Sequence, residues 1–139
     1  MKNILTHKAA RVISLAESES AKLELPGLST LSILLGLILE GSGVGAKALT
    51  LSGINVQQVY ELVEREAMLR DQTPLLLPEI VNESLKVSQK FGQDYIGTEH
   101  LLLFIACDTN KEIFDALAVP VSSLRATVLK LIGQPYTPD

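Results

Sequence analysis

Apolar and polar residues alternate along this chain with the period of an α-helix. From about Thr6 to Leu23, one face of the expected helix is apolar or small and the other is charged. The apolar face consists of Ala9, Val12, Ile13, Ala16 and Ser20, and the charged face of Lys8, Arg11, Glu17 and Glu24. Thr6 is a suitable N-cap because its side-chain oxygen can accept a hydrogen bond from a first-turn N–H group. The pattern predicts a first helix that ends before Pro26-Gly27.

Three further helices are expected in the first half of the chain. Ser29 or Thr30 begins a strongly apolar helix that runs to about Glu40, and Gly41-Ser42-Gly43 then forms a turn. A short helix follows from Val44 to Leu51 and ends at Gly53, a residue type favoured just after helix ends. Asn55 opens the fourth helix, in which apolar residues recur at helical spacing: Val56, Val59, Tyr60, Val63 and Ala67.

The second half repeats this order of elements. Helices are expected from Pro78 to Phe91, from Thr98 to about Cys107, from Lys111 to Leu117 and from Ser122 to Ile132. Thr98 is expected to be the N-cap of the second of these helices, which places Glu99 in its first turn. The only strand-like run, Leu75-Leu76-Leu77, is too short to build a sheet. We therefore predict an all-α fold of about eight helices.

The two halves are also related residue by residue. Ser29 and Gly97 are 68 positions apart, and pairs such as Thr30/Thr98 and Leu34/Leu102 coincide at the same shift. After Leu49/Leu117 the shift falls to 65 positions, so the second copy is three residues shorter there. Such repetition predicts two pseudo-symmetric four-helix units. We expect one domain over residues 1–139, with repeat one at about 4–69, a linker at about 70–76, repeat two at about 77–133 and a tail at 134–139.

Composition and charge narrow the possible functions. The net charge of −4, with basic residues scattered among acidic ones, argues against nucleic-acid binding, which needs a basic face. The longest uncharged window, Leu25–Leu39, has 15 residues, whereas a membrane-spanning helix needs about 20. The single cysteine, Cys107, indicates a reducing compartment and is expected to be a small buried apolar side chain. A soluble, intracellular protein is expected.

Two motifs suggest chemistry, and neither withstands inspection. Gly41-Ser42-Gly43-Val44-Gly45 resembles a phosphate-binding loop, but no strand precedes it and Lys47 is followed by Ala48 instead of Ser or Thr. Glu99 and His100 form the only adjacent acid–imidazole pair, yet neighbouring helical residues point about 100° apart and cannot act as a catalytic dyad. No cluster has metal-ligand spacing. We expect no enzyme activity, no cofactor and no metal.

A family resemblance becomes visible in the sequence Tyr95-Ile96-Gly97-Thr98-Glu99-His100-Leu101-Leu102-Leu103. This run resembles the most distinctive signature of the Clp N-terminal domain, or Clp repeat domain, of the Hsp100 unfoldases ClpA, ClpB and ClpC. Further matching segments are Ala9–Ala16, Leu34–Val44, Ala46–Leu49 and Val128–Gly133, so the likeness extends over about residues 4–133. The resemblance implies an all-helical double repeat that binds proteins for an ATP-driven unfoldase and its ClpP-type protease.

The resemblance also implies a ligand site. In ClpC-like proteins, the glutamate of the Gly-Thr-Glu-His motif helps to bind phosphoarginine, and the same domain docks adaptor proteins. Carried over to this chain, the second-repeat site is Gly97, Thr98 and Glu99. In the first repeat the corresponding residues are Ser29, Thr30 and Leu31, and Leu31 cannot pair with a guanidinium group, so this site is expected to be degenerate.

The segment Phe104–Asn110 also departs from the family pattern, and this departure argues against the docking of adaptor proteins at that segment.

Two roles remain open from the sequence. We expect a non-enzymatic adaptor or accessory factor of an ATP-dependent Clp unfoldase/protease system. The alternative is the N-terminal reception domain of a ClpC-type unfoldase, which would bind phosphoarginine-tagged proteins through the second repeat. The resemblance implies the bacterial cytoplasm, or the plastid stroma for a plant or algal chain. Expected partners are a Clp unfoldase, a ClpP-type protease core, adaptors and substrates. The sequence leaves the partner and the oligomeric state undetermined.

Overall fold

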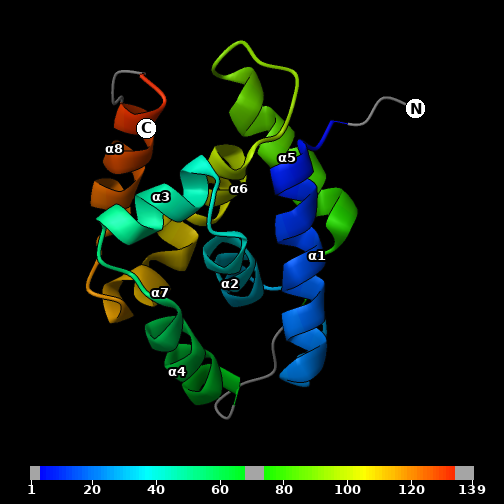
Figure 1. Cartoon of the computed structure of the whole chain (residues 1–139), viewed down its shortest axis with the longest axis vertical. Helices are drawn as coiled ribbons and strands as arrows, with labels where there is room; N and C mark the ends of the chain where they lie inside the picture. Colours follow the sequence, from blue (N-terminus) through cyan, green and yellow to red (C-terminus); the bar gives the residue numbers. More distant parts are fainter. Residues whose placement is uncertain (1–3, 68–73, 134–139) are drawn as a thin grey trace.

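The computed structural model describes residues 4–67 and 74–133 and shows an all-helical protein (Figure 1). These residues form eight α-helices, one 3₁₀ turn at Asp108–Asn110 and two isolated β-bridges. The helices are α1 (His7–Lys22), α2 (Thr30–Glu40), α3 (Val44–Leu51), α4 (Val56–Ala67), α5 (Leu77–Gln89), α6 (Thr98–Ile105), α7 (Lys111–Ala116) and α8 (Val121–Leu131). The predicted fold class and helix order are confirmed. The predicted tail at 134–139 lies outside the described residues.

Most helix boundaries follow the expected capping residues. The Thr6 side chain accepts a hydrogen bond from the Ala9 backbone N–H at 3.1 Å, which confirms Thr6 as the N-cap of α1. Asn55 begins α4 in the same way, because its side-chain oxygen accepts the N–H of Gln58 at 2.9 Å. Gly53 adopts a left-handed conformation with φ 82° just after α3, a conformation that glycine accommodates without strain.

Helix α2 lies at the centre of the molecule (Figure 1). All seven residues from Leu31 to Leu37 are buried, and the helix packs against α1, α3, α4 and α6. Gly36 allows the close approach of α1, because a Cβ atom there would lie 2.4 Å from the Val12 carbonyl oxygen. The apolar core therefore forms around α2, as its strongly apolar sequence predicts.

The two four-helix repeats are joined by backbone pairing between the segments that precede their first and second helices. Leu5, before α1, forms a bridge with Ile96, before α6. Leu75, before α5, forms a bridge with Leu28, before α2, and the Leu75 N–H donates to the Leu28 carbonyl at 2.7 Å. The segment before the first helix of each repeat thus pairs with the segment before the apolar second helix of the other repeat. The exact repeat bounds stay a prediction, and most of the expected linker falls on residues 68–73, outside the described part of the chain.

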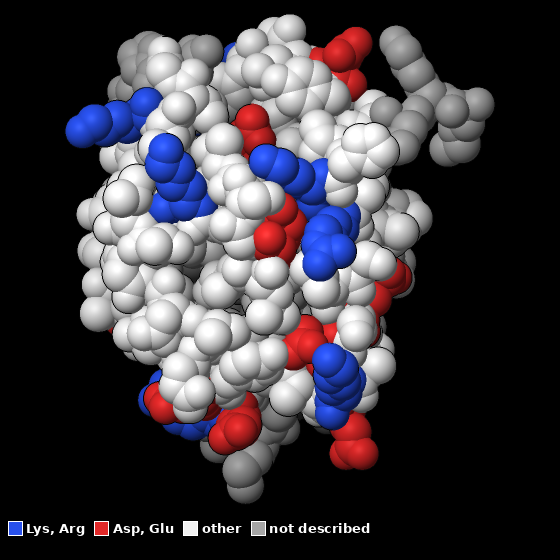
Figure 2. Space-filling model, in the orientation of Figure 1, with Lys and Arg blue, Asp and Glu red and all other residues white. Residues whose placement is uncertain are grey.

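The surface and the helix lengths bear on nucleic-acid and membrane binding. On the face shown in Figure 2, acidic and basic side chains are interspersed. Among the described helices, none is by itself long and apolar enough to cross a membrane. Helices α2 and α3 pass that test only as a pair, and they are bent by 97° relative to each other.

Candidate functional site

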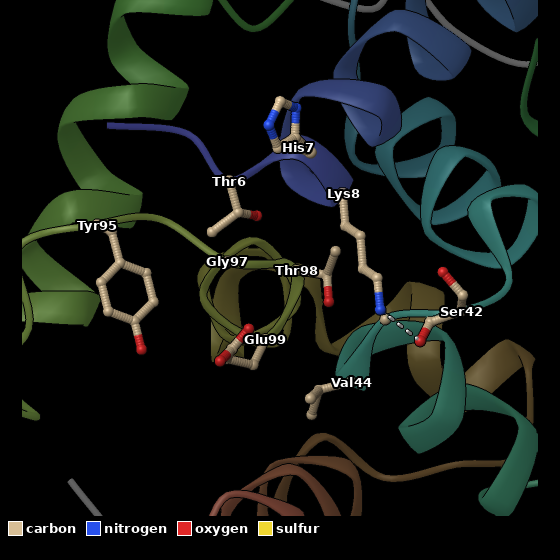
Figure 3. Close-up of a pocket in the computed structure, with 10 residues that line it drawn as sticks. Thr6, His7, Lys8, Ser42, Val44, Tyr95, Gly97, Thr98 and Glu99 are labelled. Carbon is tan, nitrogen blue, oxygen red and sulfur yellow. Dashed lines mark hydrogen bonds between the residues drawn. The ribbon is translucent and has the colours of Figure 1, made fainter. Parts of the chain in front are cut away.

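A groove of about 380 Å³ brings the predicted second-repeat residues together (Figure 3). Gly97, Thr98 and Glu99 line it at the beginning of α6. The other walls come from the start of α1 and from the turn between α2 and α3, namely Thr6, His7, Lys8, Ser42, Gly43 and Val44, with Tyr95 beside α6. The volume lies within the usual range for small-ligand pockets. The three predicted residues therefore share one concave surface, to which the first repeat contributes most of the opposite wall.

His100 fixes the backbone at the beginning of α6. Its side chain is fully buried, and Nδ1 accepts a hydrogen bond from the Gly97 N–H at 2.9 Å. Nε2 lies 2.7 Å from the Gln93 side-chain oxygen, so the ring carries its proton on Nε2 and donates to Gln93. The imidazole thus satisfies a first-turn N–H that the helix itself leaves free. The prediction that Glu99 and His100 point apart is confirmed, because His100 is buried while Glu99 lines the groove.

The predicted N-cap of α6 was wrong by one residue. Gly97 is the N-cap, with φ −98° and ψ 178°, and Thr98 is already the first helical residue. The Thr98 side chain is buried and serves the other repeat, because its Oγ1 accepts a hydrogen bond from the Gly45 N–H of α3 at 3.0 Å. The reason for the error is that Thr98 is an equally suitable capping residue by type, and only the position of α3 shows where its hydroxyl points.

The Glu99 carboxylate is available for a ligand. Its side chain is half-buried and folds back over Gly97, where an added Cβ atom would lie 2.2 Å from a carboxylate oxygen. Within the described residues it forms no hydrogen bond or ion pair. Figure 3 shows it between Tyr95 on one side and Lys8 and Val44 on the other. Glycine at position 97 therefore leaves the space that this carboxylate occupies.

Lys8 places a positive charge on the opposite wall of the groove. Its side chain is exposed and its Nζ donates a weak hydrogen bond of 3.3 Å to the Ser42 carbonyl oxygen (Figure 3). Sequence reasoning assigned Lys8 only to the outer face of a helix. The residue lies 91 positions from Glu99, and only the packing of α1 against α6 brings the two into one groove.

The glycine-rich turn after α2 is closed by the protein's own groups. The Glu40 carboxylate accepts hydrogen bonds from the N–H of Ser42 at 3.1 Å and of Gly43 at 2.7 Å, and from the Ser42 hydroxyl. Burial tends to raise the pKa of Glu40, but the hydrogen bonds from Ser42 and Gly43 and the charge of Lys8 outweigh it and lower that pKa. The Gly45 N–H is taken by Thr98. The Ser42, Gly43 and Gly45 amides, which a nucleotide phosphate would need, are therefore already occupied.

The first repeat keeps the architecture of the helix start but not the charge. The Ser32 hydroxyl accepts the N–H of Ser29 at 2.8 Å, as His100 does for Gly97, and the Ser29 hydroxyl accepts the N–H of Ser32 at 3.1 Å. Leu31, at the position of Glu99, is 3% exposed and belongs to the core, and Thr30 is half-buried. Ser29, Thr30 and Leu31 therefore form a capped helix start without a carboxylate. That this site is degenerate stays a prediction.

The segment after α6 differs from the end of α2. Helix α6 has eight residues and α2 has eleven, and the 3₁₀ turn follows α6. Arg125 of α8 donates hydrogen bonds to the carbonyl oxygens of Leu103 at 3.1 Å and Ala106 at 2.9 Å, which satisfies the end of the helix. Cys107 is half-buried, so the expectation of a buried side chain was wrong. It lies beyond the end of α6, beside the 3₁₀ turn, and not on the apolar face of the helix.

In the described ranges, His, Cys, Asp and Glu side chains form no group of three that could hold a metal ion.

Comparisons with known proteins place this geometry in a family. No protein-family model matches the chain. It is 32% identical to an ATP-dependent Clp protease ATP-binding subunit ClpA homolog of Porphyra purpurea, over 93% of this chain. It is 31% identical to the negative regulator of genetic competence ClpC/MecB of Bacillus subtilis, over 95% of this chain.

The solved structures agree with these relatives. The crystal structure of the N-terminal domain of the chaperone ClpD from Arabidopsis thaliana matches with a TM-score of 0.74 and 20% identity, covering 94% of this chain and 95% of that domain. The chain spans only 17% of the length of the two curated relatives. Its similarity to them thus extends over one domain, and its fold is that of a solved Clp N-terminal domain. The chain belongs to the Clp N-terminal domain family.

Proposed function

We propose that this chain is a non-enzymatic protein-binding module of an ATP-dependent Clp system and that it binds protein segments in the groove at the start of α6. The unpaired Glu99 carboxylate is the observation that carries the proposal. A carboxylate in a groove, opposite an ammonium group from Lys8, favours a ligand that carries both charges. The relatives' names, which include a Clp protease ATP-binding subunit and ClpC chaperone proteins, support the assignment to a Clp system.

Phosphoarginine has the required distribution of charge. Its guanidinium group can donate two parallel hydrogen bonds to the Glu99 carboxylate, the geometry that gives Arg–carboxylate pairs their strength. Its phosphate can approach Lys8 and the first-turn N–H groups of Thr98 and Glu99, which α6 itself leaves without carbonyl partners. The positive end of the helix dipole favours an anion at the same place. One ligand can thus bind the Glu99 carboxylate on one wall of the groove and the Lys8 ammonium group on the other.

We propose two alternative roles for the groove in the Clp system. The groove can receive tagged substrates for an unfoldase, or it can hold an adaptor or a partner subunit when the chain acts as an accessory factor. Since relatives include the Bacillus subtilis ClpC/MecB protein and chloroplastic ClpC proteins of rice, we propose the bacterial cytoplasm or the plastid stroma as its location. Retention of a Clp unfoldase or a ClpP-type core on the immobilised chain, and its loss on Glu99→Gln, distinguishes a groove-dependent role from a groove-independent one.

Isothermal titration calorimetry with free phosphoarginine tests the ligand assignment. We expect one binding site per chain and a loss of affinity of about 10- to 150-fold for Glu99→Gln, the equivalent of about 1.5–3 kcal/mol for a hydrogen bond to a charged group. Glu17→Gln, an exposed carboxylate of α1, is the matched control and should bind as the wild type does. Unmodified arginine and inorganic phosphate should each bind more weakly. Equal affinity of the Glu99→Gln variant and the wild type would contradict the proposal.

A further inference from the structure

The imidazole of His100 lies directly behind the groove and works in only one protonation state. Its Nδ1 accepts the Gly97 N–H at 2.9 Å, and its Nε2–H donates to Gln93 at 2.7 Å. The ring is also packed between Phe91, with centroids 6.2 Å apart, and Tyr95, at 5.7 Å. It cannot turn away without leaving an aromatic contact. A proton on Nδ1 would therefore face the Gly97 N–H, so that two donors would meet where one hydrogen bond now exists.

Gly97 is the residue through which this hydrogen bond reaches the ligand site. It is the N-cap of α6, it lines the groove, and the Glu99 side chain lies against it. A displaced Gly97 moves the surface on which the carboxylate rests and the first-turn amides beside it. We propose that His100 is a positioning residue of the groove: the unprotonated Nδ1 holds Gly97 and thereby the Glu99 carboxylate, and acid releases both. This inference rests on the proposed function.

The charges around the imidazole set the direction of its response. Glu99 is on the same helix, and Asp94 and Tyr95 are in the preceding loop. Helix α5, which packs against α6, carries Glu79, Glu83 and Lys86 and is followed by Lys90, and α3 carries Lys47. Lys8 of α1 lines the same groove as Thr98 and Glu99, Glu40 of α2 lies beside the turn that Thr98 contacts, and Arg125 of α8 binds the opposite end of α6. Burial lowers the pKa of His100, and the Glu99 charge opposes this shift. The ring is accordingly neutral at neutral pH. The hydrogen bond from the Gly97 N–H to Nδ1 is therefore present at and above the pH at which an ordinary histidine titrates, and it is lost as the pH falls below that value.

The first repeat contains a natural version of this helix start without a titrating group. Ser32, at the position of His100, holds the Ser29 N–H at 2.8 Å through a hydroxyl. A side chain that accepts this bond at every pH is therefore compatible with the fold. The comparison suggests His100→Asn, whose amide oxygen can accept from Gly97, as a variant that keeps the cap and removes the titration.

Nuclear magnetic resonance and calorimetry between pH 7.5 and 4.5 test the proposal, because the lowered pKa of His100 places its titration on the acid side of the ordinary histidine value. In the free protein, the Gly97 amide resonance should shift with the same midpoint as the His100 Cε1–H resonance. Phosphoarginine affinity should fall by about fivefold on protonation, the equilibrium factor for the loss of a typical N-cap. Titration of the ligand itself is common to all variants. His100→Asn should show only that common dependence.

A second variant keeps the test decisive if His100→Asn does not fold. Gln93→Glu places a carboxylate beside Nε2–H, which raises the pKa of His100 and should move both midpoints to higher pH. A Gly97 resonance that does not follow His100 overturns the positioning role, whether or not phosphoarginine binds. Equal pH dependence of binding in the wild type, His100→Asn and Gln93→Glu also overturns it. Absence of binding at every pH, with Gly97 following His100, overturns the proposed ligand instead.

Discussion

Replacing Thr98 by Val tests the contact that joins the two repeats at the groove. The buried Thr98 hydroxyl accepts the Gly45 N–H at 3.0 Å, and a Cβ atom at Gly45 would lie 3.0 Å from the Thr98 carbonyl oxygen. Because α3 and α6 pack this closely, water has no room to replace the lost acceptor. Valine has nearly the same shape as threonine, so the change removes the acceptor and creates little cavity. A buried N–H left without a partner costs about 1–3 kcal/mol.

Urea denaturation followed by circular dichroism measures this cost. The free energy of unfolding of Thr98→Val should fall by about 1–3 kcal/mol at an unchanged m-value, whereas Thr98→Ser, which keeps the acceptor, should lose less. Thr127→Val is the matched control, because the Thr127 hydroxyl donates to the Ser123 carbonyl at an exposed site. Its effect should stay within about 0.5 kcal/mol. If Thr98→Val is no more destabilising than Thr127→Val, the Thr98–Gly45 bond does not contribute as we argue.

Three further predictions concern stability. Gly36→Ala should destabilise the protein by about 1–3 kcal/mol or more in urea denaturation, because its Cβ would lie 2.4 Å from the Val12 carbonyl oxygen; a wild-type midpoint would contradict the close packing of α1 and α2. Tyr60→Phe should lose about 1–3 kcal/mol at pH 7, because the Tyr60 hydroxyl donates to the buried Glu19 carboxylate. The bond lowers the pKa of Glu19 and raises that of Tyr60 to about 12. The difference in the free energy of unfolding between the wild type and Tyr60→Phe should therefore shrink below about pH 4.5 and again between about pH 10 and 12. A difference that stays constant in pH-dependent denaturation would refute this linkage. Ala118→Gly should raise the thermal midpoint, with a gain of up to about 1 kcal/mol, because Ala118 has φ 62°; a lower midpoint would show that no strain is relieved.

The helical fold could be predicted from the sequence because its signals are local. Thr6, Asn55 and Gly53 begin or end helices through contacts within a few residues, and the run Leu31–Leu37 carries no polar side chain apart from Ser32. The internal repeat also predicted two similar units. Such features depend on residue type and spacing, which the sequence contains in full.

The composition of the groove could be predicted only in part. Gly97, Thr98 and Glu99 were expected together because they are adjacent in sequence, but Lys8 and Val44 reach the groove through the packing of α1 and α3. The roles within the motif were also hidden. A threonine and a histidine near a helix start have several plausible partners, and only the fold shows that Thr98 binds α3 and that His100 binds Gly97.

The central claim is that the chain has a ligand site at the start of α6 and none at the corresponding start of α2. Amide chemical-shift mapping with phosphoarginine tests it most directly, because the two helix starts are observed separately in one titration. We predict saturable shifts confined to residues 6–8, 42–44 and 95–99, and none of comparable size around Ser29, Thr30 and Leu31. Equal shifts at both helix starts, or shifts centred on the first repeat, would contradict the account.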